Sequence, residues 1–343
     1  MNQPKVTFGI VNCNRLNYLK SCLESLMFCT ETYDNKEIII VDNASVEEGT
    51  LEYLSEKQSQ GITVVRMDER DPSNEFARGL NTIFELSKGD YVCFLQGDMQ
   101  FVTRGTWLEE YINYFEKHKE HIGCIALDAQ RAVTIDSRKP YGVFEESDLN
   151  SSFRFFIDPK RPPIGGAGDA IYSRKVLDKI YPWSVKNINH EGGNDSETEM
   201  LLKVEKLRKD GTLSNLHFIS PQIPVSIAIW TDKRGTNARV RDNKRYGDYW
   251  PPKEDFRYYQ IYELEDISTI CTRESLPMPI EKLAVGVGWE VPKDEHGRWL
   301  KNPIRPETAS DDDYEVLYDE VLSEPMFVEN DSPDYLSDWL DND

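Results

Sequence analysis

The stretch YVCFLQGDMQF, Tyr91 to Phe101, begins as an apolar run and ends by placing a carboxylate, Asp98, beside a glycine. The apolar part, Tyr91 to Leu95, is typical of a strand that is buried on both faces. Gly-Asp pairs are also common in turns. Asp98 is therefore either an ordinary turn residue or an acid held at a strand tip to bind something charged, and the surrounding sequence has to decide.

Three further apolar runs precede this strand, and helical spacing of apolar residues follows each of them. The predicted strands are 6–11, 37–41 and 62–66, and the predicted helices are 17–28, 46–57 and 75–86. Continuous apolar strands that alternate with helices predict an α/β fold, with a mostly parallel sheet flanked by helices. Ligands of such sheets bind beyond the carboxyl ends of the strands. The polar residues at these ends are Asn12 to Arg15, Asp42, Asn43, Asp68 and Gln96 to Asp98.

Later segments continue the pattern and then change character. We predict a helix at 107–118, a strand at 123–127, a helix within 192–211, one or two strands within 216–231 and a β-hairpin at 282–300. Together with the earlier strands and helices, these elements predict a domain over residues 1–235. A C-terminal extension at 236–305 would hold a basic, aromatic, lid-like segment and the hairpin, and residues 306–343 would form an acidic tail that is flexible or docks.

The charge distribution argues against a nucleic-acid partner. The 343-residue chain has a formal net charge of −21, and residues 307–343 contribute fourteen Asp or Glu and no Lys or Arg. The remaining chain then carries only −7. This acidic balance argues against a nucleic-acid backbone as the main partner, because phosphate binding needs clustered Lys and Arg.

Cysteine spacing and the missing targeting signals indicate a cytoplasmic protein. The six cysteines contain no CxxC pair, which favours free thiols over a zinc site. The N-terminus has no secretory signal pattern, and no stretch approaches ~20 uninterrupted apolar residues, so we expect no transmembrane segment. Neither GxGxxG after the first strand nor GxxxxGK[ST] is present, which counts against the common phosphate-binding loops.

Five segments, in this order over roughly residues 5–235, resemble the inverting family 2 glycosyltransferases, which have the GT-A fold of nucleotide-diphospho-sugar transferases. They are VTFGIVNCNRLNYLKSCLESL (6–26), EIIIVDNAS (37–45), NEFARGLNTIFELSKGDYVCFLQGDM (74–99), GGAGDAIYSRKVL (165–177) and GGNDSETEM (192–200). The resemblance implies inverting, hexosyltransferase-like transfer from a UDP-, GDP- or dTDP-sugar to a glycan, lipid or protein hydroxyl. It also implies that Mn²⁺ or Mg²⁺ assists the diphosphate leaving group.

The resemblance also assigns roles to residues. Asp98 matches the second acid of the family's Asp-x-Asp motif and would bind the metal. Asp195 matches the catalytic base, with Glu197 as the nearby alternative. The predicted nucleotide-sugar-binding residues are Asn12, Asn14, Arg15, Asp42, Asn43, Arg78, Gln96, Gly97, Asp98, Gly168 and Asp169.

The chain departs from the family pattern at two places. Gln96 replaces the first acid of Asp-x-Asp, and the later histidine of the family's metal shell is absent, with Asp232 as a substitute. These departures keep a catalytically degenerate nucleotide-sugar-binding protein open as an alternative. A nucleotidyltransferase on a related sheet is the other alternative, although NCNRLN is not the basic, Gly-rich loop that such an enzyme normally has.

Structural explanations stay open for single residues. Asp42 would also suit a turn or helix cap, and Asp195 and Glu197 would also complement a helix N-terminus. Arg78 either lies on a helix surface or reaches the diphosphate. Arg239 and Arg241 belong either to a solvated basic loop or to a lid over the diphosphate.

Overall fold

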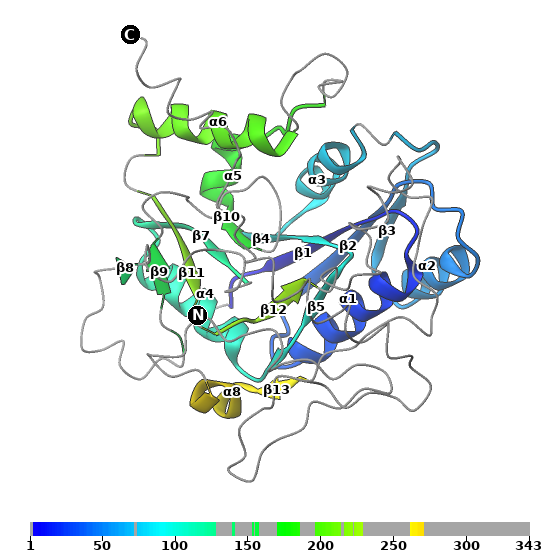
Figure 1. Cartoon of the computed structure of the whole chain (residues 1–343), viewed down its shortest axis with the longest axis horizontal. Coiled ribbons are helices and arrows are strands. Elements are labelled where there is room, and N and C mark those ends of the chain that lie inside the picture. The colour runs from blue at the N-terminus through cyan, green and yellow to red at the C-terminus, as the bar shows by residue number, and fades with distance from the viewer. Residues whose placement is uncertain are drawn as a thin grey trace, which may run out of the picture.

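A computed structural model describes most of the first 228 residues and one short segment beyond them (Figure 1). The described residues are 3–71, 74–127, 139–140, 153, 155–157, 170–185, 196–213, 216–221, 223–228 and 261–270. Within these ranges the chain forms an α/β fold, as predicted, and no helix is both long and apolar enough to cross a bilayer.

The centre of the fold is a nine-stranded sheet, counted over the described residues, with the order β3-β2-β1-β4-β10-β7-β11-β9-β8. The strands β1 to β4 are parallel to one another, β10 runs antiparallel between β4 and β7, and β11 is parallel to β7. The strand bounds are β1 Val6–Asn12, β2 Lys36–Asp42, β3 Thr63–Arg66, β4 Tyr91–Gln96, β7 Ile122–Ala126, β8 Lys139–Pro140, β9 Phe155–Ile157, β10 Ala170–Ser173 and β11 His217–Pro221.

Helices cover both faces of the sheet, as continuous apolar strands require (Figure 1). One hydrophobic core holds α1 Leu16–Cys29, α2 Thr50–Ser59 and α4 Trp107–Lys117 against one face. The other core holds α3 Glu75–Leu86, α5 Arg174–Ile180 and α6 Ser196–Lys209 against the opposite face. The polar loops that join strands to helices are therefore confined to the edges of the sheet.

Helix α3 lies unusually close to β1 because glycine occupies the contact from both sides. A Cβ at Gly9 would lie 2.1 Å from Ile83 Cγ2, and a Cβ at Gly79 would lie 2.8 Å from both methyl groups of Val11. Both distances are impossible for real atoms, so a side chain at either glycine would push the helix off the sheet. This close packing fixes α3 against the central strand.

The predicted strands and helices that fall within the described residues are confirmed, and one helix boundary is corrected. The helix predicted from Val46 begins only at Thr50, because Gly49 takes a left-handed conformation (φ 81°) directly before it. Residues 45–47 are instead held as a loop: the Ser45 hydroxyl accepts from the Asn14 N–H, and the Val46 and Glu47 N–H groups donate to Asn14 Oδ1.

Short strands follow Asp98 and tie the end of the described chain to the core. Strand β5 (Met99–Phe101) pairs with β12 (Ser226–Ala228), and β6 (Thr103–Arg104) pairs with β13 (Tyr262–Glu263). Helix α8 (Leu264–Ile270) follows β13 and buries Leu264 and Ile267 in the core of α1 and α4. The division into three regions stays a prediction, and the hairpin at 282–300 and the acidic tail lie outside the described residues.

Candidate active site

The carboxyl ends of β2, β1 and β4 lie side by side, and the candidate site is built on them. In the register of the sheet, Asn12 at the end of β1 lies beside Asp42 at the end of β2, and Val11 lies beside Gln96 at the end of β4. Strands β2 and β3 follow β1 outward on one side, and β4 returns to its other side. The topology therefore switches between β1 and β4, which is where open α/β sheets bind ligands.

Asp42 is the centre of a buried hydrogen-bond network. It is fully buried, and its Oδ1 accepts hydrogen bonds from Asn12 Nδ2 at 2.8 Å and from the Ser45 hydroxyl. Its Oδ2 accepts from the Ser45 backbone N–H at 3.0 Å and lies 3.9 Å from Arg66 Nε. A carboxylate with this many donors is held rigidly, so Asp42 fixes the two loops that frame the site.

Three residues in these loops adopt the left-handed conformation that non-glycine residues rarely take. They are Asn14 (φ 55°), Arg15 (φ 58°) and Ala44 (φ 50°), and no other non-glycine residue among the described ones has a positive φ. Such conformations cost of order 1–3 kcal/mol each and cluster at functional sites. All three lie at the same edge of the sheet, so local conformational strain in the described residues is concentrated there.

Asp98 lies in the turn between β4 and β5, so it is both a turn residue and an acid at a strand tip. It is buried, and its Oδ2 lies 3.3 Å from Arg15 Nη1. Gly97 precedes it and donates its N–H to Val11 O at 3.1 Å. A Cβ at Gly97 would lie 3.4 Å from Asn12 Oδ1, an ordinary contact distance, so the β4 tip lies directly beside the β1 tip.

Two of the predicted site residues at this edge each hold a buried polar atom with no hydrogen-bond partner among the described residues. One is Asp98 Oδ1, an acceptor, and the other is Asn43 Nδ2, a donor. Buried polar groups in native proteins are nearly always paired, so each unpaired atom calls for an explanation. A ligand that presents a cation or donor to Asp98 and an acceptor to Asn43 would satisfy both.

Among the described residues, the carboxylate of Asp98 fits the ligand preference of a hard divalent cation. Mg²⁺ and Mn²⁺ prefer oxygen ligands, and Mg²⁺ usually keeps several waters and binds through one or two carboxylates plus substrate phosphates. The unpaired Asp98 Oδ1 supplies one such oxygen. Over the parts of the chain that the structure describes, no group of three or more His, Cys, Asp or Glu is arranged around a metal position.

Arginines surround the same edge, each paired with an acid. Besides the Arg15–Asp98 and Arg66–Asp42 pairs, Arg70 Nε lies 3.4 Å from Glu75, and Arg78 Nη2 lies 3.2 Å from Asp71. The side chains of Arg66 and Arg78 are 48% exposed. Arg78 is thus an ion-paired residue on the helix surface, and its predicted contact with a diphosphate stays a prediction.

Cys13 is a buried thiol within the site. Its Sγ lies 3.4 Å from the Asn43 carbonyl oxygen, and burial, assisted by the nearby Glu75 carboxylate, raises its pKa to about 11. The thiol is therefore protonated near neutral pH and acts as a packing group, not as a nucleophile. Cys13, Cys22, Cys29, Cys93 and Cys124 are all free and buried, as the spacing of the cysteines predicted.

The structure brings together the predicted residues of the first three motifs. Asn12, Asn14, Arg15, Asp42, Asn43, Gln96, Gly97 and Asp98 all lie at the tips of β1, β2 and β4. Gly168, Asp169, Asp195, Asp232, Arg239 and Arg241 lie outside the described residues. Glu197 lies in the first turn of α6, but its side chain is not among those described.

Sequence reasoning missed Ser45, Glu47 and Arg66. Ser45 links three of the predicted residues, Arg66 stands opposite Asp42 at the end of β3, and Glu47 Oε2 accepts from the Leu16 N–H at 2.5 Å. The position of Arg66 at a neighbouring strand tip was the available signal. The roles of Ser45 and Glu47 depend on how the β2–α2 loop folds back, which periodicity does not reveal.

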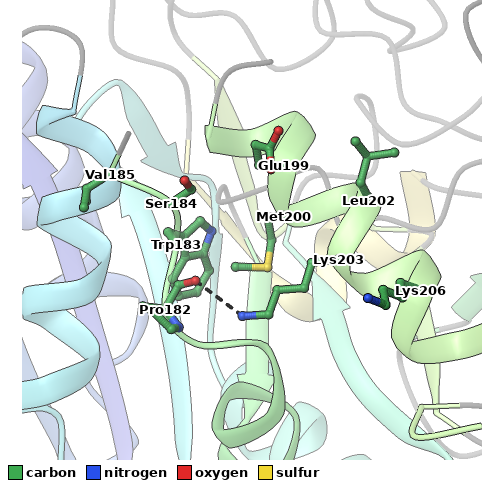
Figure 2. Close-up of a pocket in the computed structure, with 9 residues that line it drawn as sticks. All are labelled: Pro182, Trp183, Ser184, Val185, Glu199, Met200, Leu202, Lys203 and Lys206. Carbon is green, nitrogen blue, oxygen red and sulfur yellow. Dashed lines mark hydrogen bonds between the residues drawn. The ribbon is translucent and has the colours of Figure 1, made fainter. Parts of the chain in front are cut away.

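A separate pocket of about 590 Å³ lies between α6 and the segment that follows α5 (Figure 2). Its described lining comprises Pro182, Trp183, Ser184, Val185, Glu199, Met200, Leu202, Lys203 and Lys206. Figure 2 shows Lys203 reaching across to Pro182, and its Nζ also bonds the Ile180 carbonyl at 2.6 Å. Burial lowers the pKa of Lys203. The lysine thereby caps α5, and no predicted site residue with a described side chain lines this pocket.

Comparison with known proteins gives both solved structures and a curated relative. A mannosyltransferase, PcManGT from Pyrobaculum calidifontis, in complex with GDP-Man and Mn²⁺, is 18% identical, with a TM-score of 0.47 over 70% of this chain and 61% of that one. Residues 1–349 of TarS from S. aureus are 16% identical, with a TM-score of 0.40 over 58% of this chain and 54% of that one. An uncharacterized protein, y4gI of Sinorhizobium fredii (strain NBRC 101917 / NGR234), is 30% identical over 122 residues, which are 36% of this chain and 13% of that protein.

The family assignment comes from the first half of the chain. The model of glycosyl transferase family 2 matches residues 7–181, just over half of the sequence. This range holds the strand tips, the Asp42 network and the Arg15–Asp98 pair. The chain belongs to glycosyl transferase family 2, and its folded core is a glycosyltransferase domain.

Proposed function

We propose that the chain transfers a sugar from a nucleotide-diphospho-sugar to an acceptor hydroxyl, with inversion and with the help of Mn²⁺ or Mg²⁺. The observation that carries this proposal is the pair of unpartnered buried atoms, Asp98 Oδ1 and Asn43 Nδ2, at the switch point of the sheet. Together with the family membership, they support the proposal that a polar ligand binds here and that the family's chemistry takes place at this edge.

The nucleoside would bind over the tips of β1 and β2. Asn12 and Asp42 are hydrogen-bonded to each other, so their side chains would meet the nucleoside in a fixed orientation. The Asn43 amide would then supply a hydrogen-bond donor to the base or ribose. The diphosphate would lie toward β4, where Arg15 provides positive charge. The exposed Arg78, which pairs with Asp71, would supply further positive charge from α3.

Asp98 would hold the divalent cation through Oδ1, and Gln96 and Gly97 would complete this tip of the donor site. The cation, when bound, neutralises the negative charge that builds on the departing nucleoside diphosphate. With a single carboxylate supplied by the described part of the site, most of the remaining ligands would be phosphate oxygens and waters, and the metal would bind more tightly with the nucleotide than without it.

The transfer itself is one displacement. The acceptor oxygen forms a bond to the anomeric carbon, the bond from that carbon to the diphosphate oxygen breaks with its electron pair, and the hydroxyl proton passes to a carboxylate. We assign that base to Asp195, with Glu197 as the alternative, and sugar contacts to Gly168 and Asp169. The attack from the side opposite the leaving group inverts the anomeric centre.

The first test is a calorimetric titration of the purified protein with UDP, GDP and dTDP, with and without Mn²⁺. We expect one nucleotide to bind, and its binding to require the metal. Absence of binding to all of them would contradict the proposed site.

The second test uses Asp195→Asn, assayed with the sugar form of the nucleotide that binds. Loss of a general base should lower transfer about 100-fold or more while leaving donor affinity unchanged. Full activity in Asp195→Asn, with loss in Glu197→Gln, would move the base to Glu197.

The substitution of Gln96 for an acid favours one second candidate, a nucleotide-sugar-binding protein without turnover. Donor binding that leads to no transfer over a full acceptor panel would support that candidate. Release of pyrophosphate from a nucleoside triphosphate would instead reveal a nucleotidyltransferase.

A further inference from the structure

The cationic group nearest to the proposed metal-binding acid belongs to the protein itself. Arg15 Nη1 lies 3.3 Å from Asp98 Oδ2, and the side chains of Arg15 and Asp98 are 28% and 10% exposed. The other carboxylate oxygen, Oδ1, has no partner among the described residues. A guanidinium thus already provides positive charge at the place where a metal would act.

The backbone at Arg15 is held in a strained conformation by the residues on both sides of it. Arg15 has φ 58° and ψ 51°, and the Asn14 N–H before it bonds the Ser45 hydroxyl at 2.6 Å. The Leu16 N–H after it bonds Glu47 Oε2 at 2.5 Å. Because the backbone is anchored on both sides, the loop directs the arginine toward the β4 tip at the expense of local stability.

The Asn14 side chain strengthens this anchoring. It is buried, and its Oδ1 accepts hydrogen bonds from the Val46 N–H at 2.8 Å and the Glu47 N–H at 3.2 Å. The β1–α1 and β2–α2 loops are therefore tied together at three points around Arg15. The backbone around Arg15 is therefore fixed, whereas its side chain can exchange Asp98 for another partner.

We propose that Arg15 is a resident counter-cation that the metal and the nucleotide displace together. This inference rests on the proposed function and specifies how its site is regulated. A divalent cation alone must approach Asp98 against the charge of the guanidinium and so binds weakly. A diphosphate offers the guanidinium a new bidentate partner, which frees the carboxylate for the metal. Metal and nucleoside diphosphate therefore bind cooperatively, and Arg15 is the positioning residue that couples them.

The test measures Mn²⁺ binding by electron paramagnetic resonance, with Mn²⁺ alone and then with the nucleoside diphosphate that the wild-type protein binds. In the wild-type protein, we expect the nucleotide to raise the affinity for Mn²⁺ about tenfold or more, a typical size for coupling between sites. In Arg15→Gly, Mn²⁺ alone should bind several-fold more tightly, nucleotide affinity should fall, and the coupling should shrink toward onefold.

Glycine is the right replacement because it adopts the left-handed conformation without strain. Arg15→Gly should therefore fold with an unstrained backbone, although loss of the guanidinium from the buried Asp98 carboxylate lowers its melting temperature. A single cooperative melting transition separates the charge effect from misfolding. Arg15→Lys is the conservative variant: it keeps the charge but loses the planar fork, so Mn²⁺ alone should bind weakly while nucleotide affinity falls.

The matched control is Arg104→Gln. Arg104 is also an ion-paired arginine, bonded to Glu31 and Glu263, but it lies near the C-terminal end of α1, away from the strand tips. Its replacement should leave both Mn²⁺ affinity and coupling unchanged.

Two failures are distinguishable. If the wild-type protein binds neither Mn²⁺ nor any of the three nucleotides, the proposed function fails, and this inference fails with it. If the wild-type protein binds both but Arg15→Gly shows the same Mn²⁺ affinity and the same coupling, the site stands and the role of Arg15 is overturned.

Discussion

The two ends of the parallel strands both carry polar side chains, but a cluster at the amino ends of β1 and β2 is internally bonded, whereas the carboxyl ends hold unpartnered buried atoms. At the amino ends of β1 and β2, Glu37 Oε1 accepts from the Thr7 hydroxyl and the Lys88 N–H, each at 2.6 Å, and Lys5 Nζ lies 2.7 Å from Glu37 Oε2. The Thr7 hydroxyl also accepts from the Gly89 N–H at 2.9 Å. No described side chain of this amino-end cluster (Lys5, Thr7, Glu37) has an unpartnered buried polar atom.

The carboxyl ends differ in both bonding and backbone. They hold the unpartnered Asp98 Oδ1 and Asn43 Nδ2, and all three left-handed non-glycine residues of the described chain. Polar groups at a strand end thus have two distinct uses. The polar groups of the amino-end cluster bond to one another across the strands, whereas two buried atoms at the carboxyl ends have no partner in the described part of the chain. The following predictions test this division.

The largest expected effect is on binding. Asp98→Asn keeps the size of the side chain but removes its charge, so metal-dependent nucleotide affinity should fall about 100-fold, as when a charged partner is lost from a buried site. Thermal stability should change little, because only one of the two carboxylate oxygens has a protein partner. A large drop in melting temperature with intact nucleotide binding would show that Asp98 is a structural residue. It would contradict the distinction between the two ends of the strands.

Asp42 should combine both effects, since it lies at the site edge but is internally bonded. Asp42→Asn places an amide donor among donors from Asn12 and Ser45, in a fully buried position. We expect the free energy of unfolding to fall by about 2–4 kcal/mol, from mispaired buried polar groups, and nucleotide affinity to fall with it. Urea denaturation and calorimetry measure the two quantities. A variant of unchanged stability would show that the network does not hold the loops.

Features that depend on residues close together in the sequence could be predicted, whereas contacts between distant residues could not. Tyr91 to Gln96 and Glu75 to Leu86 carry their periodicity locally, so strands, helices and the layer order were predictable. The clustering of Asn12, Asp42 and Asp98 followed from the rule that parallel strand ends share an edge. The Arg15–Asp98 pair and the Ser45 hydroxyl bonds join residues that are far apart in sequence, through loops whose left-handed conformations no pattern encodes. The Arg15–Asp98 pair and the bonds of the Ser45 hydroxyl can be seen only in the three-dimensional structure.

The amino-end cluster should respond to pH and not to ligand. Burial alone would raise the pKa of Glu37, but hydrogen bonds from Lys5, Thr7 and Lys88 outweigh it and lower the pKa below its usual 4.5. A lowered folded-state pKa stabilises the protein above the usual value, and that stability is lost as the pH falls below it. Glu37→Gln should therefore cost about 1–2 kcal/mol at pH 7, and the difference from the wild-type protein should shrink between roughly pH 5 and 3.

The readout for Glu37→Gln is a series of denaturation curves over this pH range, together with nucleotide affinity at pH 7. Nucleotide affinity should equal that of the wild-type protein. A loss of affinity comparable to that of Asp98→Asn would erase the distinction between the two ends.

The smallest expected effect concerns Asn43. Because its Nδ2 is buried without a partner, Asn43→Ala removes an unsatisfied donor and should leave the melting temperature unchanged or slightly higher. Nucleotide affinity should fall about 3- to 15-fold, the usual size of one hydrogen bond. A clear loss of stability would mean that the amide already serves the fold.

The most direct measurement is a crystal structure of the protein with the nucleoside diphosphate and Mn²⁺. We predict density for the diphosphate at the carboxyl ends of β1 and β4, with Asp98 Oδ1 on the metal and Arg15 turned toward phosphate oxygens. A nucleotide in the pocket beside Trp183 and Met200, or anywhere else away from these strand tips, would contradict the placement of the active site.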